Sequence, residues 1–270
     1  MMENRLIRRS VIPLLCSLVL LAACGHMEET RSVRQEQATE FNQRAQRAFL
    51  RGEYQSAADL YGNALQLDVA IENANGIAIN MLNLARVYQV MGKPALAERY
   101  LDSLLEDRAL HYAPAQLAAA AVQKSLLRLL ENDVVGAATW VDKAAEYCVP
   151  DCTLYGVIDN ARASIALRAN DGDKALQWSE RAASENKNSS PLEYANSLRL
   201  TASARLMKNE HATALLMSEE ALVVDKSLGL PEKIRQDLLL SAQAHEKLGH
   251  AEQASQYRDR AARIAATALK

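Results

Sequence analysis

Gly92-Lys-Pro-Ala-Leu-Ala97 is one of six similar stretches in this chain of 270 residues. The others are Gly52-Glu-Tyr-Gln-Ser-Ala57, Asn132-Asp-Val-Val-Gly-Ala137, Asn170-Asp-Gly-Asp-Lys-Ala175, Asn209-Glu-His-Ala-Thr-Ala214 and Gly249-His-Ala-Glu-Gln-Ala254. Each opens on a turn-forming glycine or asparagine and ends on an alanine, and the alanines lie 40, 40, 38, 39 and 40 residues apart. Six copies of one unit at a fixed period indicate a solenoid of stacked repeats rather than a globular enzyme domain.

Two further features follow the same period. A second small or apolar residue lies seven positions after each alanine, at Ala64, Leu104, Ala144, Ala182, Ala221 and Ala261. Pro114, Pro150, Pro191 and Pro231 lie 36, 41 and 40 residues apart, and proline is favoured in the first turn of a helix because its missing N–H needs no partner there. Alternating β-branched runs typical of strands are lacking. Each period therefore predicts two helices joined by a turn, in an all-α chain.

The first two copies carry a more specific pattern. Gly52, Tyr54, Ala57, Tyr61, Ala64 and Leu65 match it in the first copy, and Leu84-Ala85, Tyr88, Gly92, Ala97, Tyr100-Leu101 and Leu104-Leu105 in the second. This pattern resembles the tetratricopeptide repeat, whose usual period is 34 residues, with a longer period similar to that of kinesin light chains. Copies three to five match mainly through their alanines. The resemblance implies a right-handed α-solenoid of about six helix–turn–helix repeats over residues 40–270.

The N-terminus has the features of an export signal. Arg5, Arg8 and Arg9 precede an apolar stretch over residues 11–21, which is too short to span a membrane as a helix. Leu21-Ala22-Ala23-Cys24 resembles the lipobox of bacterial lipoproteins. The resemblance implies a signal peptide at 1–23, a lipid anchor on Cys24, a tether over 24–39, and, because residue 25 is not aspartate, an outer-membrane lipoprotein facing the periplasm. The alternative is an ordinary signal peptide with a chance cysteine.

Charge and cysteine content narrow the function further. Without residues 1–23 the chain has 28 basic and 32 acidic residues, a formal charge of −4, and no basic stripe, which argues against a nucleic-acid partner. Cys148 and Cys152 are the cysteines beyond Cys24. In an oxidising compartment they are expected to form a disulfide. Free thiols are the alternative, and a zinc site would need four ligands, with no histidine nearby.

No motif supports an enzyme. His245-Glu246-Lys-Leu-Gly-His250 resembles a zinc-protease sequence, but that motif needs its histidines four residues apart on one helical face. Here they are five apart, with a predicted turn at Gly249. We therefore predict a non-enzymatic protein with neither a metal nor a cofactor, in which Trp140 and Trp178 are buried packing residues.

In tetratricopeptide arrays the first helix of each repeat lines the concave face. Aligning the copies on their alanines places a set of polar residues there: Asn42, Gln46, Asn83, Arg86, Asn160, Ser164, Asn196, Arg199, Ser203, Gln236 and Gln243. Amide side chains can both donate to and accept from a peptide backbone. We interpret this face as a groove for a protein or peptide partner, the alternative being a hydrated surface without a ligand.

The resemblance implies a scaffold or adaptor in the cell envelope. Lipoproteins of this type include pilotins of type IV pilus secretins, which give the leading specific hypothesis, factors of outer-membrane protein assembly, and adaptors for peptidoglycan hydrolases. A second hypothesis is a structural homo-oligomer that stacks through the alanine-rich end Ala261-Ala262-Arg-Ile-Ala-Ala266, because solenoids need capped ends.

Overall fold

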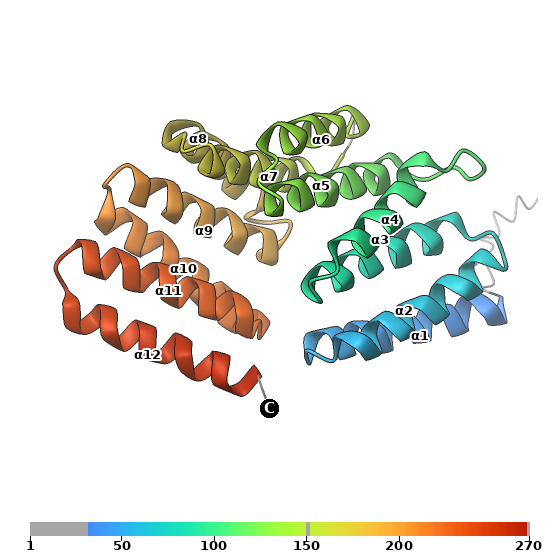
Figure 1. Ribbon diagram of the computed structural model, residues 1–270, viewed down its shortest axis with the longest axis horizontal. Coiled ribbons are helices and arrows are strands. Elements are labelled where there is room, and N and C mark those ends of the chain that lie inside the picture. Colours follow the sequence, from blue (N-terminus) through green and yellow to red (C-terminus); the bar gives the residue numbers. More distant parts are fainter. Residues whose placement is uncertain (1–31, 150–151, 269–270) are drawn as a thin grey trace, which may run out of the picture. The chain divides into compact units, whose positions relative to one another are not determined.

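The computed structural model describes residues 32–149 and 152–268, and the regular structure in these ranges is entirely α-helical, in six consecutive helix pairs (Figure 1). The first helices of the pairs, which we call A helices, are α1 (Val33–Leu50), α3 (Ala74–Val90), α5 (Pro114–Leu130), α7 (Tyr155–Arg168), α9 (Pro191–Met207) and α11 (Pro231–Lys247). The second or B helices are α2 (Tyr54–Val69), α4 (Pro94–Glu106), α6 (Val134–Tyr147), α8 (Gly172–Asn186), α10 (His211–Leu228) and α12 (Ala251–Ala268). The predicted all-α architecture of about six repeats is confirmed.

The turn within each pair is set by the residue that opens the repeated stretch. Its φ is positive in all six, at Gly52, Gly92, Asn132, Asn170, Asn209 and Gly249. Glycine lacks a Cβ and asparagine tolerates the left-handed region, so these residues end the A helix at low cost. The next N–H then donates to the carbonyl five residues back, as from Glu53 to Ala48 at 3.0 Å. This Schellman arrangement reverses the chain into the B helix.

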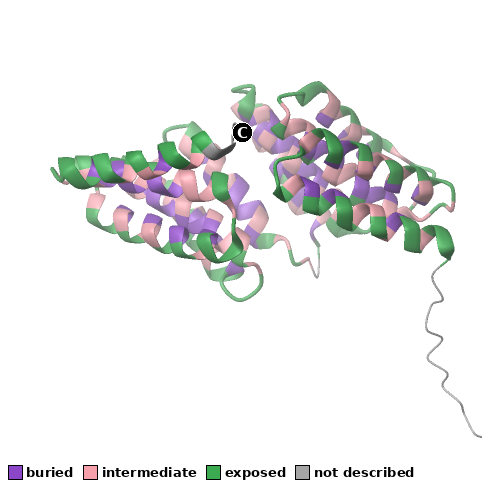
Figure 2. Ribbon diagram, turned by 90° about the horizontal axis from the view of Figure 1, so that it is seen from below, coloured by how far each residue is buried: buried purple, intermediate pink, exposed green. Residues whose placement is uncertain are grey.

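The repeated alanines lie where neighbouring helices touch. Those at 57, 97, 137, 175 and 214 are 0% exposed, and Ala254 is 1% exposed. Figure 2 shows buried residues gathered on the sides where helices meet and exposed residues on the outer sides. Each helix packs on the next, and each A helix also contacts the following A helix, whereas consecutive B helices make no such contact in the described ranges. The A helices therefore line the inner side of the stack.

The start of the solenoid differs from the predicted boundary at residue 40. Helix α1 begins at Val33, because Ser32 and Gln35 form a capping box: Gln35 N donates to Ser32 Oγ at 3.2 Å, and Ser32 N donates to Gln35 Oε1 at 2.8 Å. Residues 33–39 thus belong to the first repeat and not to the tether. The predicted signal peptide, Cys24, the rest of the tether and Pro150 lie outside the described residues. None of the described helices is both long and apolar enough to cross a membrane.

Candidate functional site: the inner face of the A helices

The residues predicted to line the groove all lie on A helices, but their side chains do not all point in the same direction. Asn42, Asn160 and Arg199 share one repeat position, three residues before a buried alanine. Another set lies one residue after that alanine, at Gln46, Arg86, Ser164, Ser203 and Gln243. The first set turns toward the next repeat and the second toward the inner surface.

Asn42 links the first and second repeats through a side-chain hydrogen bond. Its Nδ2 donates to Asn80 Oδ1 at 2.7 Å, and Asn80 Nδ2 donates to Asp68 Oδ2 at 2.8 Å. Asn73 Nδ2 donates to the other Asp68 oxygen at 2.6 Å. Burial raises the pKa of Asp68, while the hydrogen bonds from Asn73 and Asn80 oppose that shift. The side-chain amide of Asn42 thereby completes a partly buried chain of polar side chains.

Asn160 occupies the same position in the fourth repeat and is bonded in a similar way. Ser197 Oγ donates to Asn160 Oδ1 at 2.8 Å, and Asn160 Nδ2 donates to the Glu193 carbonyl at 3.1 Å. Asn186 Nδ2, from α8, donates to Ser197 Oγ at 3.2 Å. Asn160 is only 6% exposed, and its side-chain polar atoms form hydrogen bonds within the chain.

Arg199 lies at the same repeat position in the fifth repeat, where the junction is formed by ion pairs instead of amide hydrogen bonds. Its Nε donates to Asp237 Oδ1 at 2.7 Å, its Nη2 to Asp225, and its Nη1 to Asn196 Oδ1 at 2.8 Å. Both aspartate side chains are 0% exposed and that of Arg199 is 13% exposed. Arg199 is therefore the direct counter-ion of two buried carboxylates, on α10 and α11.

Sequence reasoning missed the partners of these residues on the B helices. Asp68, Asn186 and Asp225 each lie eleven residues after a repeated alanine, and that common offset could have revealed them. The equivalent junctions on either side of α5 use apolar residues instead, with Leu82 packed near Ala120, and Val122 packed near Cys148 and Ile158. Polar residues at some junctions and apolar residues at others thus occupy the same position of the repeat. That Asn42, Asn160 or Arg199 binds a ligand stays a prediction.

The residues of the second set face the inner surface. Gln46, Arg86 and Gln243 are exposed, and none of their side chains makes a hydrogen bond or ion pair within the described residues. The Arg86 guanidinium lies 4.8 Å from the centre of the Phe49 ring. Ser164 and Ser203 donate to carbonyls four residues back, at 2.9 and 3.0 Å. Of the remaining predicted residues, Asn83 is half-buried, and Gln236 donates to Glu232 at 3.2 Å.

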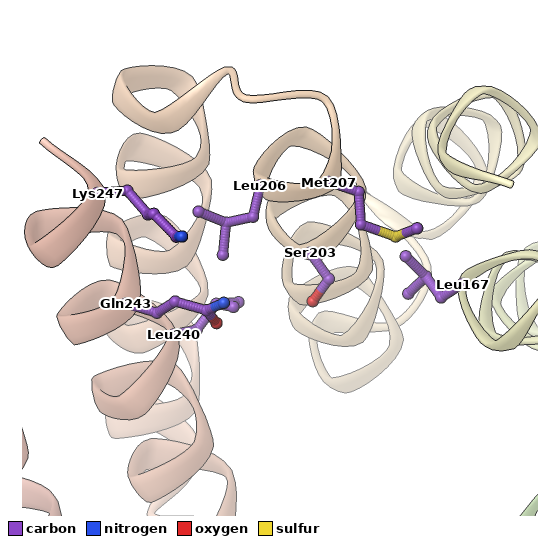
Figure 3. Close-up of a pocket in the computed structure, with 7 residues that line it drawn as sticks. All are labelled: Leu167, Ser203, Leu206, Met207, Leu240, Gln243 and Lys247. Atoms are coloured by element: carbon purple, nitrogen blue, oxygen red, sulfur yellow. The ribbon is translucent and has the colours of Figure 1, made fainter. Parts of the chain in front are cut away.

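A pocket of about 340 Å³ opens on this surface between α7, α9 and α11. It contains two predicted residues, Ser203 and Gln243, and five others: Leu167, Leu206, Met207, Leu240 and Lys247 (Figure 3). The apolar residues have the helical spacing of ordinary packing residues, which is why the sequence did not single them out.

Asp237 makes the sixth repeat sensitive to pH. Burial raises its pKa to about 7, Arg199 opposes the shift, and the Asp225 carboxylate adds to it. A carboxyl with a higher pKa in the folded state binds its proton more tightly than the unfolded chain does, so its contribution to stability is lost as pH rises from about 4 through 7. Relative to Asp237→Asn, wild-type protein is expected to lose about 1–2 kcal/mol of unfolding free energy between pH 5.5 and 8. Urea unfolding of both proteins measures this, and a constant difference would contradict it.

Cys148 and Cys152 are joined by a disulfide, with their Cα atoms 4.8 Å apart. Cys148 is fully buried and is the C-cap residue of α6, the B helix of the third repeat. Tyr155 Oη donates to the Cys148 carbonyl at 2.7 Å, so the bridge lies against the start of α7. Protein purified under oxidising conditions and then denatured is expected to show no titratable thiol from these two residues. Two thiols per chain from this pair would refute the disulfide.

The two tryptophans are half-buried rather than buried as predicted, and cationic side chains flank each ring. Lys124 and Lys143 Nζ lie 4.3 and 4.4 Å from the centre of the Trp140 ring. Arg162 and Arg181 lie 4.9 and 4.4 Å from that of Trp178. These aromatic rings cover long cationic side chains at the surface between A and B helices.

The histidines of the zinc-protease-like sequence do come close together. His245 and His250 approach at 3.3 Å between their Nδ1 atoms. Within the described ranges, however, no group of three or more histidine, cysteine or acidic side chains could hold a metal. A metal-free protein stays our prediction.

Comparison with known proteins supports the fold. No family model and no curated protein sequence matches the chain. Among solved structures, a Rap protein in complex with competence and sporulation factor is similar over 87% of this chain and 67% of its own, with a TM-score of 0.62 and 13% identity. Pseudomonas aeruginosa pilF is similar over 84% and 90%, with a TM-score of 0.53 and 16% identity. BtubC from P. vanneervenii is similar over 88% and 92%, with a TM-score of 0.55 and 17% identity. At these identities the likeness concerns the fold alone, and the chain has a tetratricopeptide-repeat-like fold.

Proposed function

We propose that this protein is a non-catalytic adaptor that holds a segment of another protein on the inner face of its A helices. The observation that carries the proposal is a set of exposed polar residues, Gln46, Arg86 and Gln243, on the A helices of the first, second and sixth repeats. These residues share one repeat position, and their exposed polar groups have no side-chain hydrogen bond or ion pair within the described residues. Gln243 also lines the pocket, so polar groups and an apolar recess lie on one surface. Such a surface suits an extended polypeptide.

We further propose that the adaptor acts at the bacterial outer membrane, facing the periplasm, through a lipid on Cys24. The support is the basic, apolar and Leu-Ala-Ala-Cys sequence of the N-terminus. Two or three lipid chains hold a protein on a membrane durably. A pilotin-like role in assembling a pilus or secretion machine is the specific role we favour, and the extensive likeness in fold to pilF is compatible with it. Expression of Cys24→Ser should shift the protein from the membrane to the soluble fraction, and unchanged membrane association would refute the anchor.

Site-specific crosslinking in intact envelopes tests the adaptor function. Photoreactive residues at Gln46, Arg86 and Gln243 are expected to capture one dominant protein. Glu146, which is exposed on the B helix α6, is the matched outer position and should not capture it. Equal capture from Glu146 would mean that the partner binds the outer side. Capture of another copy of this protein alone would favour an oligomer.

Self-association is the second candidate, and the last helix favours it. Helix α12 buries Ala254 and Ala261, whereas Ala262, Ala265 and Ala266 are exposed. A helix with exposed small residues permits close packing against a second chain. Light scattering of residues 25–270 would show a mass that rises with concentration if this is so, and a constant monomer mass would remove this candidate.

A further inference from the structure

One face of α11 carries both polar side chains, from lysine and glutamine, and an apolar side chain, from leucine. Lys233, Gln236, Leu240, Gln243 and Lys247 follow one another at intervals of three, four, three and four residues. That spacing places them on one helical face. At about 1.5 Å per residue, the two lysines at its ends are separated by about 21 Å along the helix. We call this set the α11 stripe.

The C-terminal half of the stripe forms one wall of the pocket. Leu240, Gln243 and Lys247 face residues of α7 and α9 across it. In Figure 3, Lys247 and Leu206 lie at one end, Gln243 lies beside Leu240, and Met207 lies next to Leu167. The pocket is within the usual size range of ligand sites, about 300–1,000 Å³. It therefore offers an apolar surface for a large side chain, with an amide and an ammonium group at its edge.

Neither lysine of the stripe forms an ion pair within the described residues. Lys247 is exposed, and Lys233 Nζ donates to the Asn196 side-chain oxygen at 3.0 Å. The pKa of Lys233 is lowered, first by burial and then by the nearby Arg199 guanidinium and by Arg86, while the carboxylates of Asp225 and Glu193 oppose the shift. Positive groups from α3, α9 and α11 thus act on one another near the N-terminal end of the stripe.

Several acidic groups near the stripe already form ion pairs or hydrogen bonds, among them Glu232, which accepts a hydrogen bond from Gln236. Asp225 and Asp237 bind Arg199, and Glu246, which precedes Lys247, pairs with Arg258. Glu193 accepts hydrogen bonds from Asn160 and Asn196. Lys247 is therefore left without an ion pair, and a negatively charged group of a ligand would supply one.

We propose that the α11 stripe binds an extended, acidic segment of a partner protein. One large apolar side chain of that segment enters the pocket, and an adjacent carboxylate pairs with Lys247. The exposed amide of Gln243 can bond to the backbone of an extended chain, whose N–H and C=O groups are unpaired. At about 3.3 Å per residue, a stretch of about six residues reaches from Lys247 to Lys233, where a second carboxylate would bind. This inference rests on the proposed adaptor function and specifies its partner.

A library of random heptapeptides displayed on phage, panned against the full-length protein in non-ionic detergent, tests this chemistry. Enrichment of peptides with leucine, methionine or phenylalanine next to aspartate or glutamate is expected. A fluorescent copy of the most enriched peptide should bind Lys247→Glu and Leu240→Asp at least tenfold more weakly than wild type. Lys93→Glu makes the same charge change at an exposed turn residue outside the stripe and should bind as wild type does.

Circular dichroism shows which variants remain folded. If Leu240→Asp does not fold, the peptide affinity of Lys247→Glu alone tests the inference. Lys247 is exposed, so its replacement should leave the fold intact. No enriched peptide family, enrichment of basic or uncharged peptides, or an affinity unchanged by Lys247→Glu would overturn the inference. A protein mass that rises with concentration and becomes constant in Leu240→Asp would also overturn it, since the pocket would then receive a second copy of the chain. Inner-face crosslinking to another protein would still support the adaptor function after any of these results, so the two proposals fail separately.

Discussion

Replacing Arg199 with methionine is expected to lower the free energy of unfolding by about 3–5 kcal/mol at pH 8. Arg199 bridges the carboxylates of Asp225 and Asp237, which are both 0% exposed. Methionine keeps the packing volume but leaves two buried negative charges without a counter-ion. One oxygen of each, Asp225 Oδ1 and Asp237 Oδ2, already has no hydrogen-bond partner within the described residues, so the site has no spare donor for them.

The loss should depend on pH in a specific way. At pH 5.5 the Asp237 carboxyl, whose pKa burial raises to about 7, can take up a proton in the variant, so the deficit is expected to be smaller than at pH 8. The triple variant Arg199→Met, Asp225→Asn, Asp237→Asn has no buried charge at this junction and should recover part of the loss. Arg205→Met is the control, because Arg205 pairs with the more exposed Glu180 and Glu210 and should cost no more than about 1 kcal/mol. Equal losses for Arg199→Met and Arg205→Met in urea unfolding would contradict this account.

Replacing Ala137 with leucine is expected to lower the free energy of unfolding by about 1–3 kcal/mol through overpacking. Ala137 is 0% exposed on α6, and its carbonyl accepts a hydrogen bond from Ser125 Oγ of α5 at 2.8 Å. Helices α5 and α6 would have to separate to admit the larger side chain.

Ala95→Leu is the matched control, since Ala95 is an exposed alanine near the start of the B helix α4. It should leave the melting midpoint nearly unchanged. A similar midpoint for the two variants, measured by circular dichroism, would mean that the helix crossing at Ala137 can relax around leucine.

Local features of the fold could be predicted because their causes lie within one repeat. The positive φ values at Asn132 and Asn170 follow from a turn that only a few residue types accept. The burial of Ala97 follows from the close approach of helices that are adjacent in the chain. The start of α1 was missed because the Ser32–Gln35 capping box lies in a polar stretch without the repeat pattern.

The candidate site could be predicted only in part, because helical periodicity places a residue on a broad face and no more. Asn42 and Gln46 are four residues apart and share such a face, yet Asn42 bonds to Asn80 in the next repeat while Gln46 stays exposed. A small rotation of the helix decides between these outcomes, and that rotation depends on the packing of neighbouring helices.

The sequence by itself determined the period, the helix pairs, their turns and the alanine contacts, since each arises from neighbours in the chain. Tertiary structure alone decided which polar side chains pair across a junction and which remain available on the inner face. The Arg199 junction joins residues 26 and 38 positions apart in sequence, and the pocket joins three A helices from separate repeats. Their positions follow from how successive repeats stack, because that stacking sets which side chains are excluded from water and must find partners inside the chain.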